Sequence, residues 1–180
     1  MRLIESPAMR LEPLVAAHAE EMFETLSSPA IYDYMPGAPP PSVAALRKRY
    51  ERLEMRRSGD GTQLWLNWIV RILSGRCVGF VQATIHPGTT ADFAFAFAPE
   101  YWGRGIAFEA CRMALGELAG QFGVGKFFAT VDPRNRRSTR LLERLGFSNV
   151  PPENYPNGDV VPDDRLFALI DTTASRPEGL

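Results

Sequence analysis

The 180-residue sequence has only two cysteines, two histidines and a net charge of −1, and these low values exclude several classes of protein. Cys77 and Cys111 could form at most one disulfide, and a chain of this length buries a core large enough to fold without it. No stretch approaches the roughly 18 consecutive apolar residues that a membrane span needs, and the first seven residues lack a signal-peptide core. Near-neutral charge gives no general attraction to nucleic acid or membranes. We therefore expect a cytoplasmic protein with reduced thiols and no membrane partner.

Metal binding is not predicted either. His18 is expected on the outward face of a helix and His86 in a turn, and neither has a second ligand-type residue at a suitable spacing. Cys77 and Cys111 lie in an apolar strand and on an apolar helix face, which favours packing in the core.

The sequence predicts one domain over residues 1–171, followed by a frayed tail at 172–180. The 45% hydrophobic and 23% charged residues are ordinary globular values, and the glycines and prolines fall between patterned segments. Alternating apolar patterns predict strands, and apolar residues at three- and four-residue steps predict helices. The expected strands are 2–11, 64–73, 77–85, 92–98, 126–131 and 164–170, and the expected helices are 15–27, 42–57, 105–119 and 135–145. This order predicts an α/β fold (α+β layered) with a mixed, mostly antiparallel sheet of six or seven strands flanked by four helices.

The strand 92–98 has large and small residues on opposite faces. Phe93, Phe95 and Phe97 alternate with alanines at 94, 96 and 98. A face of small side chains lets another group pack or bind closely against it.

Two glycines stand where this strand gives way to a helix, in the sequence Tyr-Trp-Gly-Arg-Gly-Ile-Ala from Tyr101 to Ala107. Gly103 and Gly105 allow successive backbone N–H groups to converge at the helix N-terminus, which makes a site for a pyrophosphate. The pattern is neither a Walker A loop nor a dinucleotide fingerprint. The alternative is a turn that contains glycines for steric reasons alone.

A second informative segment begins the last helix. Asn135 can cap it and Ser138 lies in its first turn, so both residues are also explained by helix capping. Five arginines fall between Arg134 and Arg144. They form either a solvated helix face or a basic surface that attracts cofactor phosphates or an RNA-rich target. Without interleaved aromatics, a nucleic-acid-binding module is not expected.

Taken together, the two segments resemble a known superfamily. Tyr101–Ala107 followed by Glu109-Ala110, and Asn135, Ser138 and Leu145-Gly146-Phe147, are similar to the two acetyl-CoA motifs of GNAT acetyltransferases. The Tyr-Trp-Gly-x-Gly sequence most resembles the ribosomal-protein N-acetyltransferase-like branch. The resemblance spans about Leu3 to Asp171.

The resemblance implies acetyl-CoA as co-substrate, with no metal. It implies a splay between strands 92–98 and 126–131, where the edge at Phe97 and Ala98 pairs with the pantetheine arm. Asn135 is implied to hydrogen-bond the pantetheine, and a backbone N–H near Phe97 to stabilise an oxyanion. The residues implied to hold the pyrophosphate through their backbone amides are Trp102, Gly103, Arg104, Gly105, Ile106 and Ala107.

Asp92 and Ser138 are the candidate catalytic residues. Asp92 lies where similar enzymes place an acidic residue and could accept the ammonium proton, although a solvated strand-edge aspartate is an equal alternative. Many relatives use a tyrosine one turn beyond Ser138, but Leu142 occupies that place here. Ser138, which also lies in the cofactor region, is therefore the candidate acid for the departing thiolate.

With one candidate base, we expect an easily deprotonated amine. Deprotonation at pH 7 costs about 4–5 kcal/mol for a lysine-type amine and about 1–1.4 kcal/mol for an α-amine. We therefore expect N-acetylation of a protein or peptide N-terminus. The candidate acceptor pocket is built by the loops 32–41 and 151–162, with its lining drawn from Tyr32, Tyr34, Trp68 and Tyr155.

Two alternatives remain open from the sequence. One is acetylation of a small amine such as a polyamine or aminoglycoside. The other is a non-catalytic acyl-CoA-binding regulatory module. Exposed edge strands in such folds are compatible with a homodimer.

Overall fold

The computed structural model describes residues 1–170, and the tail expected at 172–180 lies outside that range. The eight strands of a single sheet lie in the order β1-β2-β3-β4-β5-β6-β8-β7. Every neighbouring pair is antiparallel except β5 and β6. The strands are β1 (Ile4–Glu5), β2 (Met9–Pro13), β3 (Leu64–Ile72), β4 (Cys77–His86), β5 (Thr90–Phe97), β6 (Lys126–Val131), β7 (Ser148–Val150) and β8 (Arg165–Ile170).

The mixed, mostly antiparallel α/β fold is confirmed. The sheet has two strands more than the six expected ranges. The expected first strand is two short strands, because Ser6-Pro7 interrupts it. The second addition is β7, which has only three residues and no alternating pattern of its own.

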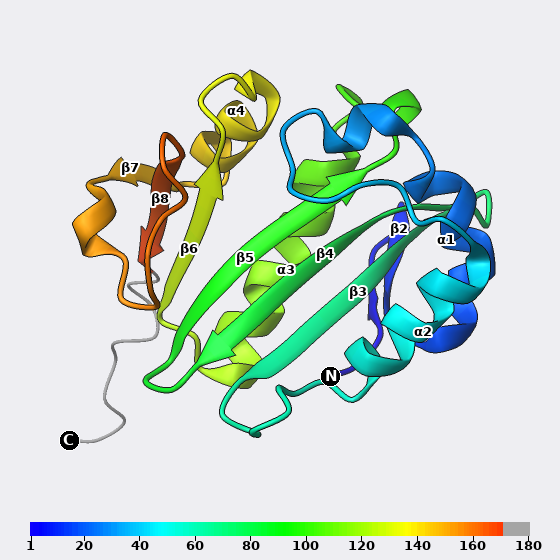
Figure 1. The fold of residues 1–180 in the computed structure, drawn as a ribbon, viewed down its shortest axis with the longest axis horizontal. Helices are drawn as coiled ribbons and strands as arrows, with labels where there is room; N and C mark the ends of the chain where they lie inside the picture. Colours follow the sequence, from blue (N-terminus) through cyan, green and yellow to red (C-terminus); the bar gives the residue numbers. More distant parts are fainter. Residues whose placement is uncertain (171–180) are drawn as a thin grey trace.

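Four α-helices flank the sheet, as expected: α1 (Ala19–Leu26), α2 (Val43–Glu54), α3 (Ile106–Phe122) and α4 (Arg136–Arg144). Helix α2 begins where predicted, because the Ser42 Oγ accepts a hydrogen bond from the Ala45 N–H at 3.1 Å. Helices α1 and α2 cover one face of the sheet and α3 covers the other (Figure 1). The first helix is shorter than its pattern, because residues 16–18 form a 3₁₀ turn.

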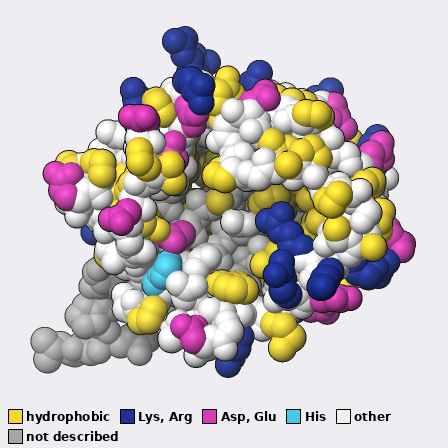
Figure 2. All heavy atoms as spheres, in the orientation of Figure 1, with side chains coloured by type: hydrophobic (Ala, Val, Ile, Leu, Met, Phe, Trp, Pro, Cys, Tyr) yellow, Lys and Arg dark blue, Asp and Glu magenta, His cyan; other side chains and the backbone are white. Residues whose placement is uncertain are grey.

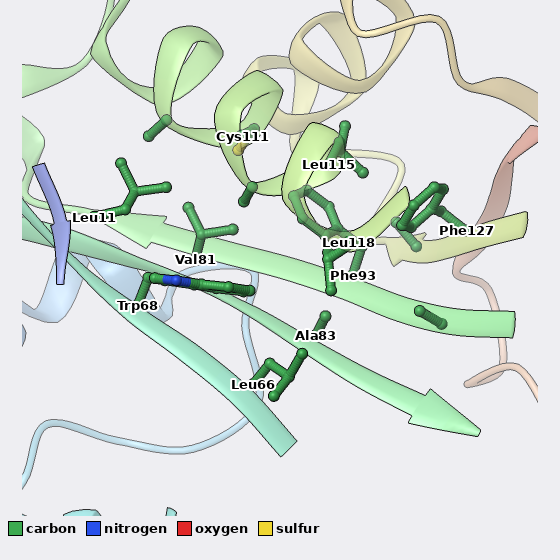
Figure 3. Close-up of a cluster of buried hydrophobic side chains, with 14 of the residues drawn as sticks. Leu11, Leu66, Trp68, Val81, Ala83, Phe93, Cys111, Leu115, Leu118 and Phe127 are labelled. Carbon is green, nitrogen blue, oxygen red and sulfur yellow. The ribbon is translucent and has the colours of Figure 1, made fainter. Parts of the chain in front are cut away.

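Side-chain alternation assigns each strand residue to one of two cores. Phe93 and Phe97 pack on the α3 side, in the larger core that Figure 3 shows, whereas Ala96 packs on the α1/α2 side. Both cysteines are buried and free, as expected.

Candidate functional site

The sheet opens between β5 and β6. The two strands pair only over Thr90–Asp92 and Lys126–Phe128, while β5 stays paired with β4 as far as Phe97. Beyond Asp92, the edge of β5 that faces β6 therefore has no strand partner, and Figure 1 shows the two strands diverging towards α4. The expected splay is confirmed.

The open edge of β5 exposes the backbone groups of alternate residues. The Ala98 N–H donates to a carbonyl of β4 at 2.9 Å, so the neighbouring Phe97 faces the open edge, as do Phe95 and Phe93. The Phe97 carbonyl accepts a 2.8 Å hydrogen bond from the Trp102 indole. The free groups on this edge are thus those of Phe95 and the Phe97 N–H, because the bridge between Asp92 and Phe128 uses the Phe93 N–H. Ala98 was also expected here, but its N–H is already used within the sheet.

At the end of β5, a glycine-containing loop leads into α3. Gly103 and Gly105 adopt φ angles of 73° and 79°, and a Cβ at either position would meet nothing within 4 Å. The glycines are therefore required by backbone conformation, not by lack of space. The first backbone bond of α3 runs from the Glu109 N–H to the Gly105 carbonyl. Between Gly103 and Phe108, no backbone N–H donates to a carbonyl of residues 1–170.

Trp102 differs from its predicted role in this loop. Its backbone N–H closes a 3₁₀ turn on the Pro99 carbonyl at 3.1 Å and is not available to a ligand. Its ring instead lies beneath the guanidinium of Arg137, whose carbon is 4.2 Å from the ring centroid. Trp102 thus links the loop to the first turn of α4.

The first turn of α4 borders the open edge. The Asn135 Oδ1 caps the helix by accepting from the Ser138 N–H at 3.1 Å, as predicted. Ser138 is half-buried, and the neighbouring Thr139 Oγ1 is buried with no hydrogen-bond partner in residues 1–170. An unpartnered buried hydroxyl, a free strand edge and converging N–H groups together fit a long ligand with a pyrophosphate, such as acetyl-CoA.

On the α1/α2 face, a groove lies over the divergence of β5 and β6. It measures about 500 Å³, its open mouth included. Its base includes Ala94, an exposed member of the small-residue face that the sequence predicted. The hollow is visible near the middle of Figure 2. Its lining residues are Gln82, Thr84, Asp92, Phe93, Ala94, Phe128, Ala129, Thr130 and Tyr155.

Asp92 lies at the closed end of the wedge, where its carboxylate is fixed by two donors. Its Oδ2 is 2.7 Å from the His86 Nε2, and its Oδ1 accepts from the Asn157 Nδ2 at 3.2 Å. The carboxyl is about one-third exposed. Burial and the nearby charge of Asp92 raise the pKa of Tyr155, so that hydroxyl remains protonated in the groove. A fixed negative charge thus faces the opening.

A chain of hydrogen bonds sets the tautomer of His86. The Trp65 indole can only donate, and it donates to the Gln63 Oε1 at 3.2 Å. The Gln63 amide nitrogen must then face the His86 Nδ1, at 3.3 Å, which makes that ring nitrogen an acceptor. The proton of the neutral ring is therefore on Nε2, from which it is donated to Asp92.

Comparison with known proteins identifies this arrangement. The model of the acetyltransferase (GNAT) domain matches residues 9–148. The chain belongs to the GNAT acetyltransferase family.

Two kinds of relative illustrate the range of the family. The uncharacterized protein YkkB of Bacillus subtilis is 33% identical over 95 residues, which are 52% of this chain and 55% of YkkB. The chain thus matches about half the length of that relative. Among solved structures, a ribosomal-protein-S5-alanine acetyltransferase from Vibrio fischeri has a TM-score of 0.78 at 17% identity, covering 98% of this chain and all of that one. A spermidine N-acetyltransferase from Vibrio cholerae, in complex with CoA and spermine, has a TM-score of 0.73 at 20% identity, covering 92% and 97%.

Of the four residues predicted to line an acceptor pocket, two line hollows on the α1/α2 face. Tyr155 lines the groove, and Tyr32 lines a smaller pocket beside it. Tyr34 is exposed and lies under the Arg134 guanidinium, 5.8 Å from carbon to ring centroid. Trp68 was wrongly placed, because it is fully buried on the opposite face of the sheet, in the core beside Leu11 (Figure 3).

Sequence reasoning missed His86 and Asn157 as partners of Asp92. A signal for His86 was present, because the hairpin pairs His86 with Thr90 and strand alternation then puts positions 86, 90 and 92 on one face. His18 was expected to face outward, but it is buried and lies 3.1 Å from a carboxylate oxygen of Glu12.

The arginines of 134–144 are not simply a solvated face. Besides Arg137 on Trp102, Arg144 lies over the ring of Phe108 at 4.0 Å. These contacts join α4 to the start of α3, across the region of the free N–H groups.

Residues 1–170 contain no cluster of three or more histidine, cysteine or acidic side chains suited to a metal ion. None of the helices in that range is long and apolar enough to cross a membrane.

Proposed function

We propose that this GNAT acetyltransferase transfers the acetyl group of acetyl-CoA to the N-terminal α-amine of a protein or peptide. The observation that carries the proposal is Asp92, fixed by two donors at the closed end of the groove. It is the only carboxylate in the groove lining, so a single acidic side chain serves as base. An α-amine suits such a base, because its deprotonation at pH 7 costs about 3 kcal/mol less than that of a lysine-type amine.

The cofactor side uses the backbone. Acetyl-CoA supplies an activated thioester, so positioning accounts for much of the rate. The free N–H groups of 103–107 bind the pyrophosphate, and the open edge at Phe95 and Phe97 pairs with the pantetheine arm. The thioester end of that arm must approach Asp92, which lies about 16 Å along β5 from Phe97, so the outward N–H of Phe95, nearer Asp92 on the same edge, is the donor for a carbonyl oxygen that gains negative charge. Asn135 holds the pantetheine through its amide nitrogen, since its oxygen is already used by the helix cap.

The acceptor side uses side chains. Asp92 attracts the ammonium group and accepts its proton, directly or through water. His86 and Asn157 act on Asp92 and are positioning residues. Ser138, half-buried in the first turn of α4, is the acid for the departing thiolate.

Polyamine acetylation is the second candidate. The spermidine acetyltransferase from Vibrio cholerae has the same fold, and the segment after β7 contributes exposed acidic residues that would attract a polycation. Against it, basic side chains gather on the α2 side of the hollow (Figure 2). A binding module without turnover is the third candidate.

The test is release of the CoA thiol from acetyl-CoA over a panel of free N-terminal peptides, polyamines and aminoglycosides. A peptide signal that disappears when the α-amine is blocked supports the proposal. A signal with small amines alone overturns the choice of acceptor. Binding of acetyl-CoA without turnover on any member, and with no effect of Asp92→Asn or Ser138→Ala on binding, favours the module.

A further inference from the structure

A second, smaller pocket adjoins the groove, and Gln82 lines both. It lies between α2 and the sheet, on the same face as Asp92. Its other lining residues are Leu14, Leu26, Tyr32, Arg49, Tyr50, Leu53, Asn67 and Phe80.

The polar groups of this pocket are rich in donors. Tyr50 is 3% exposed, and its hydroxyl has no hydrogen-bond partner in residues 1–170. Burial raises the pKa of Tyr50, so the hydroxyl stays protonated and able to donate. The side-chain amides of Asn67 and Gln82 make no hydrogen bond within the described chain, and Arg49 contributes a guanidinium that forms no ion pair there.

Helix geometry explains why Arg49 borders the pocket while its neighbour does not. Leu46, Tyr50 and Leu53 form the face of α2 that packs on the sheet. Arg49 lies at the side of that face, about 100° from Tyr50, whereas Lys48 lies about 200° away and points to solvent. Figure 2 shows the basic side chains gathered at the α2 side of the hollow.

The strand register gives the separation between the two ends of the groove. Asn67 pairs with Gln82, and Gln82 pairs with Ala94, so the pocket over β3 lies two strands from β5. Two strand spacings are about 10 Å, and Ala94 lies two residues, about 7 Å, along β5 from Asp92, so the diagonal from Asp92 to the pocket is about 12 Å. An extended peptide advances about 3.3 Å per residue, so from an α-amine at Asp92 the side chain of the third or fourth residue reaches this pocket.

Resting on the proposed function, we propose that the Arg49–Tyr50 pocket binds a carboxylate on the third or fourth residue of the acceptor peptide. The acceptor class is therefore a protein or peptide N-terminus with an early acidic residue. The amine is recognised by Asp92 at one end of the groove, and the acid by donors at the other. A polyamine, which has no anionic group, would gain nothing from this pocket.

The experiment measures kcat/KM for peptides that differ only at the third or fourth residue, which is aspartate, asparagine or lysine. The wild type should favour the better-placed aspartate peptide about tenfold over asparagine. Arg49→Gln and Tyr50→Phe should each reduce that preference to about twofold, and Arg49→Glu should reverse it towards lysine. Lys48→Gln is the matched control, since it removes a neighbouring cation that faces solvent, and it should leave the preference unchanged. Acetyl-CoA affinity confirms that each variant is folded.

The results separate the two proposals. Acetylation of all peptides at equal rates by the wild type overturns the carboxylate pocket but leaves the peptide acceptor in place. If Lys48→Gln removes the preference for aspartate as fully as Arg49→Gln does, the pocket proposal is also overturned. The preference would then come from the overall positive charge of α2 and not from a contact in the pocket. Acetylation of polyamines and of no peptide overturns the proposed function, and the carboxylate pocket with it.

Discussion

Replacing Asp92 by asparagine tests the acceptor site most directly. The new side chain has the same size but no charge, and its amide nitrogen must oppose one of the two donors that now fix the carboxylate, the His86 Nε2 at 2.7 Å or the Asn157 Nδ2 at 3.2 Å. Loss of a general base lowers turnover by about 10²- to 10⁴-fold. We expect kcat to fall within that range on an α-amine peptide, with little change in acetyl-CoA affinity, because the cofactor groups lie on the edge and far end of β5.

His86 variants show whether the histidine acts through Asp92. A hydrogen bond to a charged group contributes about 1.5–3 kcal/mol, which is roughly a 10- to 100-fold change in rate if the bond serves the transition state. His86→Leu should lose that amount, whereas His86→Gln, which can still donate, should retain most activity. Combined with Asp92→Asn, His86→Leu should have little further effect, because residues that act as a unit are not additive.

The assay is initial-rate thiol release at saturating acetyl-CoA, with cofactor affinity measured separately by calorimetry. Asp159→Asn serves as the control, because it removes an exposed carboxylate from the segment that also contains Asn157. The reasoning is refuted if Asp92→Asn retains kcat within threefold of wild type, or if Asp159→Asn is equally damaging.

Three further predictions concern the scaffold. Gly79→Ala should destabilise the protein by about 2–4 kcal/mol in urea unfolding, because a Cβ there would clash with the Ala96 carbonyl oxygen, and wild-type stability would contradict this. Arg71→Met should cost about 2–3 kcal/mol at pH 7, because Arg71 pairs with two glutamates at 2.8 and 2.6 Å. Burial alone would raise the pKa of the Glu12 and Glu21 carboxyls, but the hydrogen bonds from Arg71 lower it. The stabilisation by these ion pairs is therefore present above about pH 4.5. The difference in unfolding free energy between Arg71→Met and the wild type should narrow as the pH falls below that value. Burial raises the pKa of Cys77 to about 12 and that of Cys111 well above its ordinary value, so a thiol reagent should label both only after urea is added.

Local features of the fold were predictable from the sequence. The Ser42 and Asn135 caps and the glycines of the loop before α3 depend on neighbouring residues alone, so short patterns identify them. Trp68 was not predictable in this way. The strand that contains it is apolar on both faces, because each face packs under helices, and alternation therefore gives no indication of which way its ring points.

Long-range contacts account for the rest of what was missed. Asn157 contacts Asp92 across 65 residues, from a loop whose path depends on β7, and no local pattern encodes that contact. The backbone partners of Trp102 and Ala98 were also missed, because motif recognition identifies which residues surround a cofactor but not which N–H groups are already used.

One strand serves both halves of the site, which makes its register critical. On β5, the backbone of Phe93, Phe95 and Phe97 faces the open edge, while the side chains of Asp92 and Ala94 face the groove. A slip of one residue would turn Asp92 towards the α3 core and bring a phenylalanine into the groove. Gly79 opposes this slip, because only a residue without a Cβ fits against the backbone at Ala96 and Phe97. The close approach at that end of β5 thus fixes the position of the Asp92 carboxylate, five residues from Phe97. For this reason we expect substitutions of Gly79 and of the proposed base Asp92 to affect the same reaction.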